Sequence, residues 1–423
     1  MSDPKHNERQ ELASPPGSIM HGSGLLSATE HRRKLHSIPE IGLELPHTLS
    51  YLRQALQAAG LAPRNCSTGL IADIGENGPL IALRADMDAL PINEESGLPY
   101  ASRHAGAMHA CGHDAHMAAL LAAAQSLAAK PPRDYRVRCI FQPGEEGFFG
   151  APAMISAGCL DGVAAIAGGH VGDLSEELAP GQLGFMHGSM MAASDLFAGA
   201  FLGSGGHGSA PHHARDPIPA LVQFINGAYA LRSREADQRR PFVISVCQLD
   251  AGSAFNIIPE RAAFKGTARS LGEKERELAK RGLRRLCEGS AMAMGVDFEF
   301  EWTDGYPSLV NDAASVEACM AGAQRLLGTG RVKMLSAPSM GGEDFAYYLQ
   351  KIPGCFWFMN SQNPERGIRY PNHHPRFDVD EALLDDVADL HIASAAALAD
   401  LVIGRPAIHA AGQRADQRGG LKQ

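Results

Sequence analysis

Short apolar runs, each followed by acidic or imidazole side chains, recur in the first half of the chain and alternate with helical patterns. Residues 46–59 carry apolar positions at helical spacing, and 117–129 are rich in Ala and Leu. This alternation predicts an α/β fold with a largely parallel sheet covered by helices, in which ligands bind beyond the carboxyl ends of the strands. The apolar runs and the polar groups behind them are 80–83 with Asp86 and Asp88, 136–141 with Glu145 and Glu146, and 163–167 with His170.

Residues 191–303 have a different pattern, which predicts a second unit inserted into the first. A chain of 423 residues exceeds the usual size of one core. We predict a catalytic domain formed by 1–190 and 304–423 and interrupted by a smaller α+β domain over 191–303, with disordered ends over about the first 20 residues and from about 405. The elements expected in the insert are strands at 195–202, 242–249 and 298–302 and helices at 217–231 and 273–293.

Composition excludes several classes of partner. The net charge of -9 argues against a nucleic-acid partner, which would require a basic face. We find no secretory signal, and we expect that no apolar run is long enough to span a membrane. The 8 cysteines form no CxxC pair, which favours reduced thiols. We therefore expect a cytoplasmic protein.

The stretch His-Ala-Cys-Gly-His-Asp at 109–114 places a thiol and an imidazole two residues apart, with a carboxylate directly behind them. A loop of this kind can aim Cys111 and His113 at one point, and both are good ligands for zinc and other borderline divalent metals. We expect Asp114 to fix the tautomer of His113.

The acidic and imidazole groups together indicate a two-metal hydrolytic site. Two divalent ions can share a bridging ligand and a water, and such sites activate the water and polarise a carbonyl. Thiolate ligation favours zinc, while the carboxylates also tolerate manganese, cobalt or nickel. Glu145 is free to act as general base, taking a proton from the attacking water and passing it to the leaving nitrogen. The candidate ligands are Cys111, His113, Glu146, His170 and one of His373 and His374.

From Arg32 to about Leu398 the chain resembles the amidohydrolase branch of the di-metal peptidases. That branch includes hippurate hydrolases, N-acyl-L-amino-acid amidohydrolases and plant indole-acetyl-amino-acid hydrolases. The stretches that carry the resemblance are RRKLHSIPE at 32–40, LRADMDALPI at 83–92, CGHD at 111–114, FQPGEE at 141–146, GHGSAP at 206–211, FNIIP at 255–259 and MGGEDF at 340–345.

The resemblance implies roles for individual residues. Asp88 would orient the ligands, whereas the role of Asp86 stays open. His207 would polarise the scissile carbonyl, often from the partner subunit of a dimer, and Asn256 and Arg269 would hold the free carboxylate of the substrate. Glu145 matches the general base, and the metal ligands implied are Cys111, His113, Glu146, His170 and His373, the last because Pro375 completes a His-x-Pro pattern.

The resemblance implies a metal-dependent amidohydrolase that cleaves N-acyl amino acids to a carboxylic acid and a free amino acid by a metal-activated water. It also implies a homodimer or higher homo-oligomer, and we expect the insert to dimerise and to close over the substrate on hinges near 188–193 and 304–307. The alternatives are a dipeptidase or carboxypeptidase on the same fold, a cysteine hydrolase using Cys111 and His113, and a non-catalytic metal-binding module. Gly144 and residues 172–176 depart from the family pattern near the metals, which predicts an unusual substrate preference.

Overall fold

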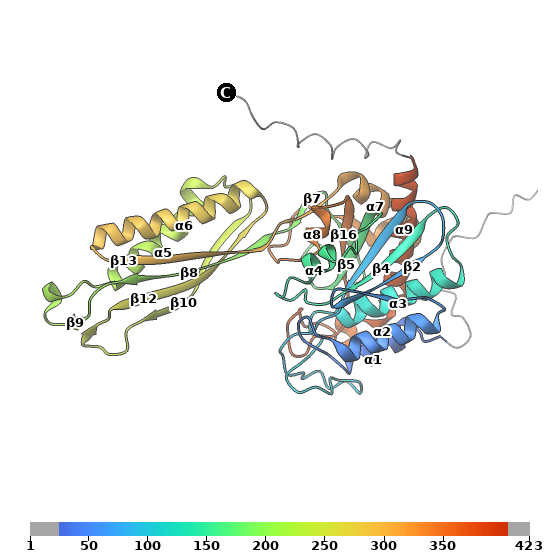
Figure 1. Cartoon of the computed structure of the whole chain (residues 1–423), viewed down its shortest axis with the longest axis horizontal. Coiled ribbons are helices and arrows are strands. Elements are labelled where there is room, and N and C mark those ends of the chain that lie inside the picture. The colour runs from blue at the N-terminus through green and yellow to red at the C-terminus, as the bar shows by residue number, and fades with distance from the viewer. Residues whose placement is uncertain (1–24, 405–423) are drawn as a thin grey trace, which may run out of the picture.

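The computed structural model describes residues 25–404, so both ends predicted to be disordered lie outside the described residues. A sheet of eight strands in the order β1-β2-β4-β3-β5-β16-β6-β15 forms the centre of the larger unit (Figure 1). Its middle strands β4, β3, β5 and β16 run parallel to one another. The prediction of an α/β fold with a largely parallel sheet is confirmed. The strands are β1 (Arg64–Cys66), β2 (Gly69–Ile74), β3 (Leu80–Asp86), β4 (Arg136–Gln142), β5 (Val163–Gly172), β6 (Leu183–Phe185), β15 (Val332–Met334) and β16 (Gly354–Asn360).

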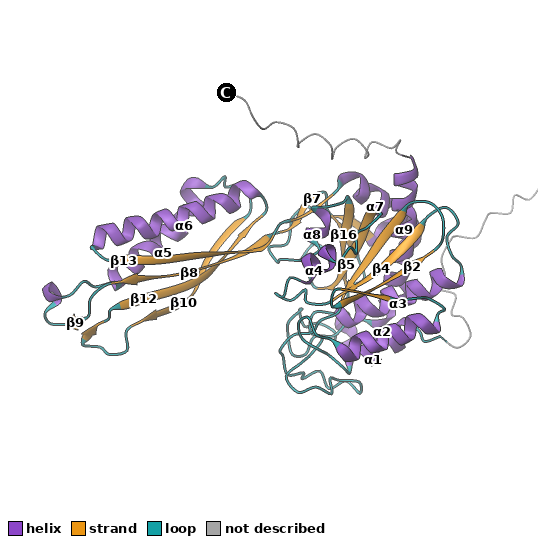
Figure 2. Ribbon diagram, viewed as in Figure 1, coloured by secondary structure: helices purple, strands orange, loops and turns teal. Residues whose placement is uncertain are grey.

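Helices cover both faces of this sheet, which explains why its strands read as continuous apolar runs (Figure 2). In β3, Ile81 and Leu83 face one apolar cluster, while Leu80 and Ala82 face the other. The first cluster includes residues of α1 (Ala28–His36), α2 (Pro46–Ala58), α3 (His113–Ala129), α7 (Ala313–Leu327) and α9 (Leu384–Gly404). The second includes residues of α4 (Gly150–Ser156), α8 (Ala346–Leu349), β7 (Gly188–Met191) and β14 (Leu309–Asn311).

The C-terminal helix is long and apolar. The segment Glu381–Gly404 has 24 residues and passes the length and composition test for a membrane span, with 50% of its most apolar window buried inside the fold. The sequence-based statement that no apolar run reaches this length is therefore wrong. Helix α9 packs against α3 and α7, and burial in a protein core requires the same apolar composition.

A second sheet extends away from the first as an arm, which we call the insert (Ala193–Tyr306; Figure 1). Its antiparallel strands lie in the order β10-β12-β8-β13, and two helices pack with them around a phenylalanine-rich core. The predicted boundaries at 190/191 and 303/304 stay a prediction. The elements are β8 (Ala193–Leu202), α5 (Ile218–Glu235), β10 (Phe242–Ala251), β12 (Arg261–Ser270), α6 (Glu273–Met294) and β13 (Asp297–Tyr306), with β9 (Gly206–His207) and β11 (Ile257–Ile258) paired at the far tip.

Candidate metal centre

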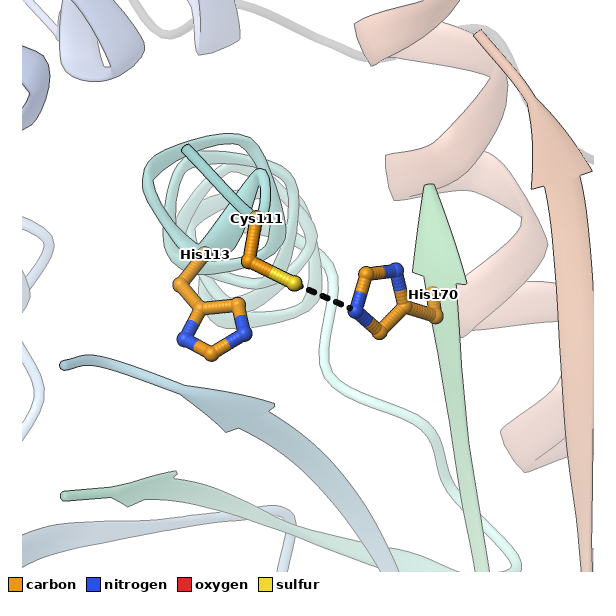
Figure 3. A group of neighbouring side chains, drawn as sticks. All are labelled: Cys111, His113 and His170. Atoms are coloured by element: carbon orange, nitrogen blue, oxygen red, sulfur yellow. Dashed lines mark hydrogen bonds between the residues drawn. The ribbon is translucent and has the colours of Figure 1, made fainter. Parts of the chain in front are cut away.

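The loop before α3 aims two side chains at the end of β5. Gly112 has a φ of +88°, a conformation that favours glycine, and a Cβ there would lie 3.0 Å from Val171 Cγ2. The sharp turn starts α3 at His113 and sends Cys111 and His113 toward the same region as His170 (Figure 3). Cys111 Sγ lies 3.3 Å from His170 Nε2. His170 was expected to follow its strand, but it lies within β5, which runs on to Gly172.

The side chains of His373 and Glu146 also lie close to Cys111. His373 Nε2 lies 3.2 Å from Cys111 Sγ and 3.3 Å from Glu146 Oε1. His373 has a φ of +69°, and its backbone N–H donates to the Ala110 carbonyl at 2.7 Å, which ties it to the cysteine loop. His374 points elsewhere, with its ring stacked 4.4 Å from that of Tyr370. The structure thus brings His373, and not His374, to the cluster.

The donor atoms of this cluster fit divalent cations. Cys111 belongs to two groups of donor atoms that each lie within 4.8 Å of one another, one with His113 and His170 and the other with Glu146 and His373. Donors bound tetrahedrally at zinc distances lie about 3.3 to 3.8 Å apart, close to the separations seen here. His113 Nε2 is buried and has no hydrogen-bond partner within the described residues, as expected of an atom placed to hold a metal.

The charge around the cluster also favours bound cations. Asp86, Glu343 and Asp344 are buried and share Arg84, which contacts them at 2.6, 3.1 and 2.9 Å. Burial, and then Glu343 and Glu146, raise the pKa of Glu145 well above its usual value. Burial opposes protonation of His113, but Asp86 and the other carboxylates outweigh it and raise the pKa of His113 to about 10. A buried excess of carboxylates over cations is costly unless a cation binds.

Asp88 fixes the loop that carries Glu145 and Glu146. Its Oδ1 accepts from the Glu145 backbone N–H at 2.9 Å, and its Oδ2 accepts from the Glu146 N–H at 3.0 Å. The Asp88 carbonyl lies 2.8 Å from His113 Nδ1. Because a carbonyl can only accept, this contact assigns the proton of neutral His113 to Nδ1 and leaves the lone pair of Nε2 facing the cluster. Asp88 therefore orients both the imidazole of His113, a candidate metal ligand, and the two glutamates.

The prediction that Asp114 fixes the His113 tautomer is wrong, because the Asp88 carbonyl does so. Asp114 points away and pairs with Arg32 at 3.0 Å and with His36 at 2.8 Å. Arg32 also contacts Asp378, which follows the His373 loop in the chain, at 2.7 Å. This ion network joins α1 to α3, which follows the Cys111 loop, and to the segment that follows His373.

The sequence did not predict the roles of His116, Arg84 and Tyr306 at this site. Asp86 Oδ1 lies 2.6 Å from His116 Nδ1, and His116 Nε2 accepts from the Val171 N–H at 2.9 Å, so His116 links Asp86 to β5. A signal existed for Arg84, since a charged residue within an otherwise apolar strand needs buried partners. No sequence signal pointed to Tyr306, whose hydroxyl donates to the Glu145 carbonyl and accepts from the Gly147 N–H.

A cavity of about 580 Å³ opens beside the cluster and receives side chains from both units. Glu145 and Glu146 line it from the larger unit, and Arg269 on β12 lines it from the insert. The Arg269 guanidinium lies over Gly342, where an added Cβ would be 3.5 Å from Nη1. No carboxylate is paired with this half-buried arginine in the described part of the chain. The Arg269 guanidinium is therefore available to bind an anionic group of a ligand.

The other two predicted substrate residues do not reach this cavity within one chain. His207 lies on β9 at the far tip of the insert, and the Asn256 carbonyl accepts from Gly208 beside it at 2.8 Å (Figure 1). His207 is exposed, and its Nδ1 lies 2.7 Å from Ser209 Oγ. The structure thus separates His207 and Asn256 from the candidate metal ligands.

Comparison with known proteins identifies the family. The model of peptidase family M20/M25/M40 matches residues 82–395, which include every candidate metal ligand. The chain belongs to this family. Its members here include an N-acetylcysteine deacetylase of Bacillus subtilis, 39% identical over 84% of this chain and 92% of the relative. A thermostable carboxypeptidase of Saccharolobus solfataricus is 37% identical over 84% of this chain and 90% of its own length.

A solved M20 structure shares the architecture. A Bacillus subtilis protein described as a dinuclear metal-binding peptidase of the M20 family is 35% identical, with a TM-score of 0.74 over 88% of this chain and 97% of that one. The chain is accordingly an enzyme of the M20 hydrolase family, a group of metal-dependent peptidases and amidohydrolases. The M20 relatives differ in the activities that their names state, so the family alone does not identify the substrate.

Proposed function

We propose that this enzyme hydrolyses the amide bond of N-acyl amino acids and releases a carboxylic acid and a free amino acid. The observation that carries the proposal is the unpaired Arg269 in the same cavity as Glu145 and the metal-binding groups. An arginine suits a carboxylate through bidentate hydrogen bonds, and every N-acyl amino acid has such a group beside its scissile amide.

The proposed cofactor is a pair of divalent ions, zinc or manganese in the first place, with cobalt or nickel also suited to the donors. Cys111 belongs to both groups of donor atoms. The ligands would be Cys111, His113, Glu146, His170 and His373. When bound, such ions activate water and polarise the substrate carbonyl.

Glu145 is the proposed general base. Its carboxyl lines the cavity, while its backbone is held by Asp88 on one side and by Tyr306 on the other. The buried carboxyl has a raised pKa, which suits a group that accepts a proton from water and then delivers it to the leaving nitrogen. Asp88 positions this base and does not itself line the cavity.

A cysteine hydrolase is a weaker interpretation of the same site. Burial, and then Glu146 and Glu145, raise the pKa of the Cys111 thiol well above its usual value, whereas a nucleophilic thiol needs a lowered one. Its sulfur also lies between His170 and His373, the arrangement of a metal ligand. Loss of activity on chelation and recovery with added metal would support the metal-dependent reaction.

A second subunit is part of the proposal. His207 and Asn256 lie at the exposed tip of the insert, so they would act on a substrate only from the partner of a homodimer. We propose that the insert dimerises and closes over the cavity, with hinges near 188–193 and 304–307. Closure would exclude water from the site. We also propose that the enzyme works in the cytoplasm.

A carboxypeptidase or dipeptidase is the second candidate, because Arg269 would serve the carboxylate of a peptide equally well and one M20 relative is named a carboxypeptidase. A panel of benzoyl- and acetyl-amino acids and free dipeptides, tested with zinc, manganese, cobalt and nickel, separates the two activities. Release of amino acids from the acylated substrates at a higher kcat/KM than from dipeptides is expected. The reverse order would overturn the proposed function in favour of a peptidase.

A further inference from the structure

Phe149 lies in the wall of the active-site cavity in a backbone conformation that is unfavourable for its type. It has a φ of +58°, in the left-handed region, where a bulky side chain is rare. Its side chain is 38% exposed, so burial in a core does not account for the phenylalanine. Residues kept in such a conformation against the local preference concentrate at ligand-binding positions.

Phe149 lines the same cavity as Tyr306, Ser194 and Arg269. It meets the ring of Tyr306 edge to face, with 5.0 Å between the centroids. Tyr306 pairs with Ser194 on the neighbouring strand, and Ser194 pairs with Arg269 on the next. Because neighbouring strands lie about 4.8 Å apart, the Arg269 and Tyr306 backbones are about 10 Å apart, and Phe149 contacts the Tyr306 ring.

These positions suggest an orientation for the substrate. A carboxylate held by Arg269 would leave the scissile amide near Glu145, whose carbonyl accepts from the Tyr306 hydroxyl, and the acyl group near Phe149. Leu174, from the loop that departs from the family pattern, adds a second apolar surface to the cavity. The acyl group would therefore meet the aromatic face made by Phe149 and Tyr306.

We propose that Phe149 is a specificity-determining residue whose ring contacts the acyl group and selects large apolar acyl groups, aryl groups above all, over acetyl. The inference rests on the proposed function, since it concerns the acyl half of an N-acyl amino acid. An acetyl group is too short to pack against the ring, whereas an aryl group gains an aromatic contact and buried area.

The neighbouring Phe148 provides a matched control. It is 45% exposed, which is close to Phe149, but it does not line the cavity. Its ring packs over Gly42, where an added Cβ would lie 3.2 Å from Cε1. Phe148→Ala therefore removes the same side chain from the same loop without changing the cavity wall. Phe149→Gly supplies a further variant, because glycine accepts a positive φ and does not depend on the phenylalanine to fold.

The test compares kcat/KM for the N-benzoyl and N-acetyl forms of one amino acid, using the metal-loaded enzyme and its variants. Phe149→Ala and Phe149→Gly should lower the benzoyl-to-acetyl ratio about tenfold, while Phe148→Ala should leave it within about twofold, and Phe149→Gly should melt no lower than wild type. An unchanged ratio in both Phe149 variants, or an equal fall in Phe148→Ala, would overturn the inference alone. Failure of wild type to hydrolyse either substrate would overturn the proposed function, and the inference with it.

Discussion

Replacing Asp88 with asparagine tests how much of the activity depends on the loop that carries the general base. Asparagine has nearly the same shape, so packing is conserved while one oxygen becomes an amide NH₂. The two Asp88 oxygens each accept one backbone N–H, from Glu145 at 2.9 Å and from Glu146 at 3.0 Å. The asparagine oxygen can accept from only one of these backbone N–H groups. The other N–H group would face the side-chain NH₂, which is itself a donor.

The expected magnitude follows from the lost contact. A hydrogen bond to a charged group contributes roughly 1.5–3 kcal/mol, and Asp88 is only 1% exposed, so water does not replace the acceptor. If this free energy is lost from the stabilisation of the transition state, kcat falls roughly 10- to 100-fold, since each 1.36 kcal/mol corresponds to a factor of ten. Loss of groups that orient metal ligands has effects of similar size, about 10- to 100-fold, on metal affinity or activity.

The assay measures kcat, metal content and melting temperature for Asp88→Asn beside a control. Asp312→Asn is suitable, since Asp312 also accepts a backbone N–H, from Ser315 at 2.9 Å, but caps α7 away from the cavity. We expect the control to keep its turnover even if it loses some stability. A kcat and metal content in Asp88→Asn within twofold of wild type would refute the argument that this carboxylate positions the loop.

Three further predictions concern the ligands and the substrate groups. Cys111→Ala should lower both metal content and rate, and full occupancy with normal turnover would remove Cys111 from the ligand set. Arg269→Ala should raise KM strongly for carboxylate-bearing substrates and much less for their amide analogues; equal effects on both would mean that Arg269 does not bind the carboxylate. Mixing inactive His207→Ala protein with inactive Glu145→Gln protein should restore some activity through hybrid dimers, and no recovery after proven subunit exchange would place His207 outside the partner's site.

The sequence predicted α2, β3, α3, β4 and β5 of the larger unit because their signals are local. Strands buried on both faces, such as β3 and β4, appear as continuous apolar runs bounded by turns. Strand β12 was not predicted, because its small and charged residues carry little strand preference and its pairing with β8 and β10 is long-range. Arg269 was nevertheless singled out, through the family resemblance.

In the candidate site, too, residue types and motifs could be predicted from the sequence, whereas contacts between distant residues could not. Cys111, His113, Glu146, His170 and His373 could be chosen from residue type and motif, and the structure gathers them. The tautomer of a histidine depends on which group contacts its ring, and that group can be distant in the sequence. The sequence therefore predicted the adjacent Asp114 as the partner of His113, whereas the structure shows the Asp88 carbonyl. Contacts of this kind, like that of Tyr306 with the Glu145 backbone, link residues that are far apart in the sequence.

The central claim is that Glu145 moves the proton while Glu146 binds metal, and the most direct measurement is the metal content and turnover of Glu145→Gln beside Glu146→Gln. Glu145→Gln should keep the metal content of wild type and lose about 10²- to 10⁴-fold in kcat, as is typical for removal of a general base. Glu146→Gln should lose metal, because its Oε1 faces His373 in the cluster. Metal loss in Glu145→Gln with metal retained in Glu146→Gln would contradict the account and reverse the two roles.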